Sequence, residues 1–294
     1  MKRALALIQL LRPQQWYKNM VVFIGIIFSA NLFNAAMLWK VVAAFFLISL
    51  VSGVNYIIND IKDMEKDRLH PTKKSRPLPS GKVSKFAAAI FAAGMLLAAS
   101  YFSFIVSQQF FYFIVFFFIF GLAYTFFLKN IFLADIIAIS VNFVFRAIMG
   151  AVVIDVSSST WLIAMAFLFA LVLAATKRKG ELFLLGKGAA SHRENLEKYD
   201  PQILDYISIF SLTSLFMSYL VYAIIVRAGT YFTATLPFVV YIIFRYLLFI
   251  VKRPQELASP EKFLFDRSVI ISAIFIAAII FLTFYIPLPQ IIKT

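Results

Sequence analysis

The sequence predicts an all-α integral membrane protein with nine transmembrane helices, and three observations support this. Hydrophobic residues make up 62% of the 294 positions and charged residues only 14%, against roughly 45–50% and about 25% in soluble domains. The apolar residues form continuous runs of about 20, the length at which a helix crosses a bilayer. Short alternating segments, which are typical of a β-barrel, are not seen. A soluble globular protein is therefore excluded.

The nine runs lie between clusters of charged residues and indicate a single polytopic domain over residues 1–294. We expect residues 1–15 to form a short segment in the membrane interface, because the apolar stretch Ala4–Leu11 is short and Arg12-Pro13 follows it in place of a signal-peptide cleavage site. Two long connections, 60–84 and 177–202, carry many polar residues and are predicted to be cytoplasmic active-site loops. The predicted spans are residues 16–37, 40–59, 85–106, 108–128, 131–153, 160–176, 203–225, 229–250 and 268–288.

The basic residues predict how the spans are oriented. Of 28 Lys and Arg residues, 23 fall on the side of the N-terminus and only 3 on the other side. Positive charge marks cytoplasmic connections, so the N-terminus is predicted to be cytoplasmic and the C-terminus outside, in the inner (plasma) membrane. This placement also explains the net charge of +14 without a nucleic-acid partner.

An acidic motif follows the second predicted span. Asn55, Asn59, Asp63 and Asp67 are each four residues apart, so on a helix they stay along one side. Stacked carboxylates repel one another unless a cation lies between them, and Mg²⁺ prefers oxygen ligands with positions left for phosphate. We expect Asn59, Asp63 and Asp67 to bind Mg²⁺ with help from Asp60. The alternative is a solvated helix end with lysine partners.

Cations and prolines come directly after this motif. Carboxylates followed by basic side chains form a metal-plus-cation clamp that suits a diphosphate, and the prolines stiffen the loop that presents them. The cations expected to bind phosphate oxygens are Arg68, Lys73, Lys74 and Arg76.

The run N-D-x-x-D-x-x-x-D from Asn59 to Asp67 resembles the first aspartate-rich motif of the UbiA-like intramembrane prenyltransferases. The resemblance implies nine helical spans around a central cavity that opens to the cytoplasmic face and to lipid. It also implies Mg²⁺-dependent binding of an isoprenoid diphosphate.

Most members of that superfamily carry a second aspartate-rich motif after the sixth span, but here Lys177-Arg178-Lys179-Gly180-Glu181 stands there. Together with Leu11–Asn19 and Tyr124–Lys129, this run resembles the decaprenyl-phosphate phosphoribosyltransferase branch. The resemblance implies transfer of phosphoribose from phosphoribosyl diphosphate to a polyprenyl phosphate, for arabinosyl-donor synthesis. The alternative for the basic run alone is ordinary anchoring on the cytoplasmic side.

Substrate-binding residues are also expected outside the acidic motif. The cations expected to position the lipid head group are Lys18, Lys129, Arg146, Lys177 and Arg178. Asn142 and Arg146 are four residues apart in the fifth span, where an arginine is expensive unless it faces a polar cavity or partner. The alternative is a buried polar pair that fixes helix packing. Tyr124 belongs to the same set, and Glu181 is expected to pair with Lys177 or to orient a substrate hydroxyl.

Two other functions stay open from the sequence. A prenyltransferase that moves an isoprenoid from its diphosphate to an aromatic or other acceptor fits the Asn59–Asp67 motif equally well. A transporter of an anionic lipid or metabolite is compatible with the intramembrane Arg146, but the outer connections carry few polar residues. Homo-oligomers are compatible with every reading.

Overall fold

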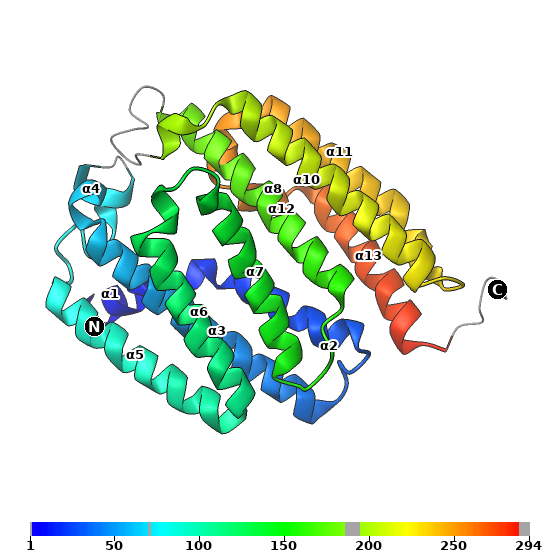
Figure 1. The fold of residues 1–294 in the computed structure, drawn as a ribbon, viewed down its shortest axis with the longest axis horizontal. Coiled ribbons are helices and arrows are strands. Elements are labelled where there is room, and N and C mark those ends of the chain that lie inside the picture. Colours follow the sequence, from blue (N-terminus) through cyan, green and yellow to red (C-terminus); the bar gives the residue numbers. More distant parts are fainter. Residues whose placement is uncertain (1, 70–71, 186–194, 288–294) are drawn as a thin grey trace. The chain divides into compact units, whose positions relative to one another are not determined.

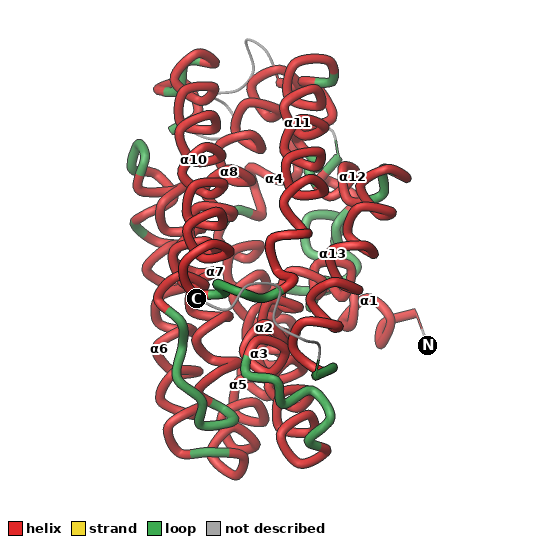
Figure 2. Tube along the Cα trace, turned by 90° about the vertical axis from the view of Figure 1, so that its right-hand side faces the viewer, coloured by secondary structure: helices red, strands yellow, loops and turns green. Residues whose placement is uncertain are grey.

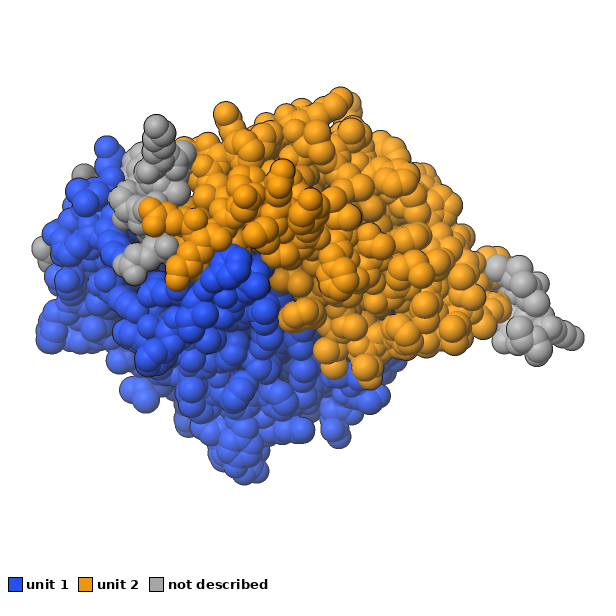
Figure 3. All heavy atoms as spheres, turned by 45° about the horizontal axis from the view of Figure 1, so that its top comes forward, with its two compact units in different colours: residues 1–158, 191–194 blue, residues 159–190, 195–294 orange. Residues whose placement is uncertain are grey.

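The computed structural model describes residues 2–69, 72–185 and 195–287, and these form helices joined by turns, with no strand (Figures 1 and 2). They divide into two compact units, one up to residue 158 and the other from residue 159 (Figure 3). Eight helices in the described ranges are long and apolar enough to cross a membrane. The predictions of an all-α fold and a multi-pass membrane protein are confirmed, whereas nine spans and a single domain stay predictions.

The first unit contains the acidic motif and most of the predicted site. Its elements in chain order are α1 (Lys2–Leu10), η1 (Pro13–Phe23), α2 (Ile24–Phe28), α3 (Ala35–Lys62), α4 (Met64–Leu69), η2 (Lys73–Ser75), α5 (Lys85–Val106), α6 (Gln108–Phe126), η3 (Leu128–Asn130) and α7 (Ala134–Val152).

The long helices of this unit begin at polar capping residues. The side chains of Asn34, Ser84 and Ser107 accept hydrogen bonds from backbone N–H groups in the first turns of α3, α5 and α6. Such caps satisfy donors that a helix start leaves unpaired. The predicted spans 85–106 and 108–128 therefore coincide closely with α5 and α6.

Two apolar clusters hold the first unit together around α3. One contains Val41, Ile48, Phe110, Phe117 and Met149, from α3, α6 and α7. The other lies nearer the acidic motif and covers the end of α3 with residues from α1 and α5: its members include Leu10, Leu11, Val54, Ile57 and Ala88. The end of α3 that carries Asn59 and Asp60 is thus packed on several sides.

The first predicted span, 16–37, is not one helix. η1 ends at Phe23 and continues directly into α2, which ends at Phe28, and Ala30 has a positive φ of 58°. The side chain of Asn34 then caps α3, which begins at Ala35. The chain therefore turns inside the predicted span, where α2 ends and the capped helix α3 begins, although the composition of this region is apolar.

η1 and α2 lie directly against α7 because glycines let the backbones approach. A Cβ atom on Gly150 would lie 2.0 Å from the carbonyl oxygen of Val22, and one on Gly25 would lie 3.1 Å from the Ala151 backbone. This contact brings Asn19 of η1 next to Arg146 of α7.

The second unit consists of helices from the second half of the chain. Its elements are α8 (Thr160–Leu185), η5 (Leu196–Lys198), α10 (Pro201–Val221), the π-helical turn η6 (Tyr222–Val226), η7 (Tyr231–Thr235), α11 (Leu236–Lys252), η8 (Pro254–Ala258), α12 (Glu261–Leu264) and α13 (Arg267–Tyr285). Its core includes Val172, Leu212, Tyr246, Phe249 and Leu257.

α8 runs nine residues beyond the predicted end of the sixth span at residue 176. The predicted loop 177–202 is therefore wrong for Lys177–Leu185, and its residues 186–194 lie outside the described part. The helix continues because its charged side chains find partners: Lys179 donates to Asp205 of α10 at 2.6 Å. In the other predicted loop, 60–84, residues 70 and 71 lie outside the described residues, and α4 and η2 give it helical structure.

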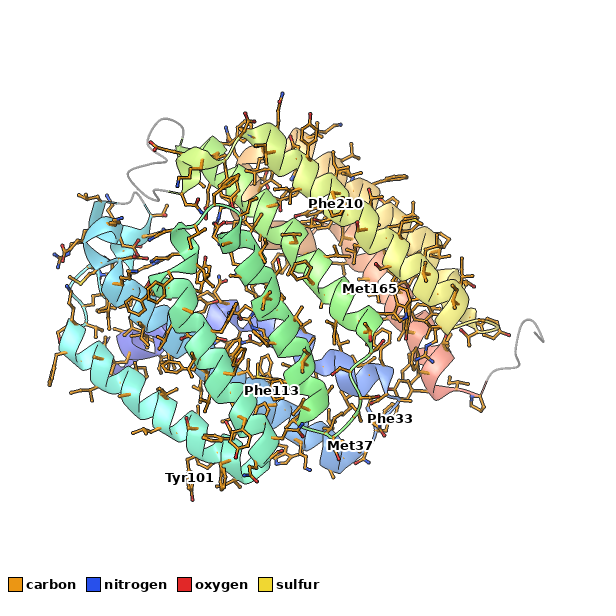
Figure 4. All side chains as sticks on the ribbon, viewed as in Figure 1. Phe33, Met37, Tyr101, Phe113, Met165 and Phe210 are labelled. Atoms are coloured by element: carbon orange, nitrogen blue, oxygen red, sulfur yellow. The ribbon has the colours of Figure 1, made fainter. Side chains whose placement is uncertain are left out.

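Large apolar side chains cover the outer faces of both units. Tyr101 on α5 is 64% exposed and Phe210 on α10 is 69% exposed, and Figure 4 shows Tyr101 at the outer edge of its unit. Exposed aromatic side chains on membrane-length helices are the surface that lipid covers.

Candidate active site

The acidic motif spans the end of α3 and the start of α4. Asp63 directly follows α3 as its C-cap, and its backbone N–H still donates to the carbonyl of Asn59, while Asp67 N–H donates to the carbonyl of Asp63. The near-helical path keeps the four-residue spacing, but the side chains divide into two groups, each with its own cations.

The first group surrounds Lys129, which lies in η3 after α6. Its ammonium group donates hydrogen bonds to Asn59 Oδ1 at 3.0 Å and to the two carboxylate oxygens of Asp63 at 2.7 and 2.6 Å. Lys129 is buried, and three oxygen atoms satisfy its three donors. The structure therefore brings Asn59 and Asp63 together around one cation position.

The second group joins Asp60 and Asp67 through Arg76. Arg76 Nη1 donates to Asp60 Oδ1 at 3.1 Å and to Asp67 Oδ2 at 2.8 Å. Arg12 also donates to Asp60 Oδ1 and stacks over the ring of Tyr56 at 4.8 Å. Lys73 lies 3.7 Å from Asp67. Asp67 is therefore held among basic side chains, away from the three oxygens around Lys129.

Burial lowers the pKa of the Arg76 guanidinium from its usual value, and the positive charge of Arg12 lowers this pKa further. Arginine still stays protonated at neutral pH. Two guanidinium groups close together are tolerated here because Asp60 and Asp67 supply the opposite charges.

Oxygen donors of this kind suit Mg²⁺. No group of three or more His, Cys, Asp or Glu in the described ranges can hold a metal by itself. Asn59 and Asp63 nevertheless present converging hard oxygens, and Mg²⁺ commonly uses one or two carboxylates and takes its remaining ligands from water and phosphate. The pair fits such a substrate-assisted site, and Asp67 would need to turn from Arg76 to join it.

A polar chain crosses the interior of the same unit. Arg146 Nε donates to Asn19 Oδ1 at 2.7 Å, and Asn19 Nδ2 donates to Ser49 Oγ at 2.9 Å. The guanidinium lies between the rings of Phe117 and Phe143 at 5.2 and 5.1 Å. Arg146 contacts the backbone carbonyl of Asn142 at 3.3 Å, while the buried Asn142 Oδ1 has no hydrogen-bond partner.

The remaining predicted residues of the first unit are more peripheral. Arg68 pairs with Glu65 at 2.8 Å on an exposed surface. Lys18 lies near the ring of Tyr17 at 5.8 Å, and Tyr124 is half-buried in the last turns of α6.

The basic run of the second unit is largely neutralised within that unit. Arg178 is 2% exposed and donates to Glu181 at 2.7 Å. Lys179 pairs with Asp205, and Gly180 packs closely against the backbone of Leu257 and Ala258. Lys177 lies on the same helix, one residue before Arg178.

Residues 19–270 match the model of the UbiA prenyltransferase family. The chain belongs to the UbiA prenyltransferase family. The decaprenyl-phosphate phosphoribosyltransferase of Mycolicibacterium smegmatis is 32% identical to this UbiA protein over 217 residues, which are 72% of this chain and 68% of that one. The Mycobacterium tuberculosis (strain H37Rv) protein of the same name is 29% identical over 216 residues, 72% of each chain.

Solved structures agree on the fold. A UbiA homolog from Archaeoglobus fulgidus bound to DMAPP and Mg²⁺ superposes with a TM-score of 0.65 at 18% sequence identity, covering 95% of this chain and 99% of that one. The predicted family is confirmed, and this UbiA protein is a membrane-embedded transferase.

Sequence reasoning assigned no separate role to three residues of the UbiA site. Arg12 reaches Asp60 from the N-terminal segment, Asn55 has a buried Oδ1 without a hydrogen-bond partner, and Lys62 donates to the carbonyl of Thr125. Asn55 had a signal, because it begins the four-residue repeat. The contacts of Arg12 and Lys62 join residues 48 and 63 positions apart, which no local pattern reveals.

Proposed function

We propose that the protein transfers 5-phosphoribose from 5-phosphoribosyl 1-diphosphate to a polyprenyl phosphate, of the decaprenyl type, and releases diphosphate. The observation that carries this proposal is the similarity to decaprenyl-phosphate phosphoribosyltransferases over 72% of the chain. Lys177-Arg178-Lys179 at the position of the usual second acidic motif supports an anionic acceptor. The product would enter cell-envelope or arabinosyl-donor synthesis.

The donor would bind at the acidic motif. Asn59 and Asp63, joined by Asp67, are the residues that would hold Mg²⁺, which when bound would neutralise the diphosphate. Arg76 is oriented by Asp60 and Asp67 and would take further phosphate oxygens with Lys73 and Arg68. Charge-assisted hydrogen bonds of this type are shorter and stronger than neutral ones.

The acceptor phosphate needs positive side chains but no strong base, because it is already an anion at neutral pH. Lys18, Lys129, Arg146, Lys177 and Arg178 would position it, with Tyr124, Asn142 and Glu181 as polar neighbours. Its oxygen would form a bond to the anomeric carbon of the ribose as the bond from that carbon to the diphosphate breaks. Developing positive charge at this carbon is expected at glycosyl centres, and in-line attack predicts inversion.

A second function, transfer of an isoprenoid from its diphosphate, is favoured by one specific observation. The Archaeoglobus fulgidus homolog with this fold was solved with DMAPP and Mg²⁺. The two functions differ in the donor, so a comparison of donors separates them.

The orientation belongs to the proposal as well. The 23-to-3 split of basic residues supports an N-terminus in the cytoplasm and a C-terminus outside, in the inner (plasma) membrane. The soluble donor would then reach the acidic motif from the cytoplasm.

The deciding experiment is mass spectrometry of the lipid product. Purified protein receives Mg²⁺ and a polyprenyl phosphate with phosphoribosyl diphosphate, or an aromatic acceptor with an isoprenoid diphosphate. We expect a polyprenylphosphoryl-5-phosphoribose and diphosphate release that depends on the lipid phosphate. Asp63→Asn should abolish turnover, while Glu256→Gln, an acid of η8, serves as the matched control. A prenylated acceptor with no phosphoribosyl lipid would replace this proposal by the second function.

A further inference from the structure

Lys129 occupies the place where the proposed Mg²⁺ site has its best ligands. Its ammonium group contacts Asn59 Oδ1 and both oxygens of Asp63 within 3.0 Å. These are three of the oxygens that a divalent cation would use. Lys129 is buried, so water screens its charge weakly.

A divalent ion bound by these three oxygens together would need the position that the ammonium group occupies. A divalent ion about 2.1 Å from the carboxylate would lie almost on top of the ammonium nitrogen, and like charges at such a distance repel strongly in a poorly screened site. Lys129 must therefore leave Asn59 and Asp63 before a metal ion binds them.

The backbone that carries Lys129 is anchored independently. Lys62, the last residue of α3, donates to the carbonyl oxygens of Thr125 at 2.9 Å and Phe126 at 3.4 Å. These carbonyls belong to the end of α6, where a helix leaves acceptors unpaired and favours positive charge. Lys62 thus links α3 to the end of α6 and Lys129 links η3 back to the acidic motif, and only the Lys129 contact involves the oxygens proposed to bind metal.

We propose that Lys129 is a positioning residue that holds the oxygens of Asn59 and Asp63 together in the metal-free protein and yields them to the divalent cation. Because Lys62 holds the end of α6, directly before η3, the released ammonium would stay close to Asn59 and Asp63. The inference rests on the proposed function, since it assumes that the acidic motif binds a divalent metal.

Competition between Lys129 and a metal ion predicts the direction in which metal affinity changes when the lysine charge is removed. If the ammonium-bound state dominates, the apparent metal affinity is reduced by the fraction of protein in which the oxygens are available. Removing the charge should then strengthen metal binding, whereas loss of an ordinary structural contact would weaken it or leave it unchanged.

The test is Mn²⁺ binding to the purified full-length protein, measured from the electron paramagnetic resonance signal of free Mn²⁺. We expect Lys129→Met to bind Mn²⁺ at least about tenfold more tightly than the unaltered protein, and Lys129→Gln to change in the same direction. Lys82→Met removes a positive charge from an exposed loop residue and should leave the affinity unchanged. Adding Asp63→Asn to Lys129→Met should remove the gained affinity.

Equal or weaker binding by both Lys129 variants, with measurable binding by the unaltered protein, would overturn the role of Lys129 and leave the proposed function intact. No Mn²⁺ binding by any variant, with or without phosphoribosyl diphosphate, would instead overturn the metal site and this inference together. Thermal unfolding of each variant in the same detergent verifies that the compared proteins are folded.

Discussion

Replacing Asp60 by Asn should destabilise the first unit by about 2–3 kcal/mol. Asp60 is 2% exposed, and its Oδ1 accepts hydrogen bonds from both Arg12 and Arg76. The amide keeps the size of the side chain but removes its charge, so two neighbouring guanidinium groups lose a shared counter-ion. Removing one partner of a buried ion pair costs roughly 3–5 kcal/mol. The arginine side chains are 18% and 30% exposed, and partial solvent screening reduces the expected cost.

The assay is equilibrium unfolding in mixed micelles with increasing fractions of denaturing detergent. Glu65→Gln is the matched control, because Glu65 is 66% exposed and surface pairs contribute about 0–1 kcal/mol. The double variant Arg12→Gln with Asp60→Asn should be less destabilised than the sum of the two single variants, since one unpaired guanidinium is then absent. A stability of Asp60→Asn within about 0.5 kcal/mol of the unaltered protein, or strict additivity, would refute this account of the cluster.

Three further predictions concern packing, pH and topology. Gly150→Ala should destabilise the protein by roughly 1–3 kcal/mol, because a Cβ would lie 2.0 Å from the Val22 carbonyl oxygen. Gly94→Ala should be neutral or stabilising, because a Cβ there meets nothing within 4 Å. Equal midpoints of the two variants in thermal unfolding would contradict this prediction. Hydrogen bonds from Ser268, with a smaller contribution from Arg245, lower the pKa of Asp266 from 3.8 to about 2. This carboxylate therefore contributes stability above about pH 4 that is lost as the pH falls toward about 2. Asp266→Asn should flatten this part of the plot of unfolding free energy against pH. An unchanged slope of that plot would show that Asp266 makes no such contribution. The chain has no cysteine, so the single substitutions Lys82→Cys and Gln109→Cys can report the orientation. A membrane-impermeant maleimide added to intact cells should label position 109 and not position 82. The reverse labelling pattern would invert the proposed topology.

Much of the fold follows from local composition and capping. Residues 85–106 were predicted as a span, and α5 covers the same residues because Ser84 caps its start. The prediction of one continuous helix over residues 16–37 was wrong, because hydropathy does not detect a turn made by Asn31 and Asn34 inside an apolar region. The helix of the sixth predicted span continues past residue 176 for a related reason. Lys177–Lys179 look like a helix end, but Asp205 and Glu181 neutralise two of these cations and α8 continues.

The candidate site was predictable only in part. The four-residue repeat places Asn59 and Asp63 together, because that contact is set by helix geometry. Lys129 was predicted to bind substrate. Its contact with Asp63 was not predicted, because the two residues lie 66 positions apart. The separation of the Asp67 side chain from that of Asp63 depends on where Arg76 lies at the end of η2. Sequence spacing therefore identified which residues carry the chemistry, while tertiary packing decided which cation each carboxylate meets.

The left-handed backbone at Arg12, with φ 52° and ψ 62°, ties the N-terminal segment to the acidic motif at the end of α3. A non-glycine residue in this conformation is energetically unfavourable, and here it turns the guanidinium back onto Asp60 while Leu10 and Leu11 cover Val54 and Ile57. Proteolytic cleavage before Pro13, or a bulky purification tag against α1, would therefore remove or disturb the contact of Arg12 with Asp60. Preparations should be screened for an intact start of the chain before weak turnover is blamed on the lipid substrate.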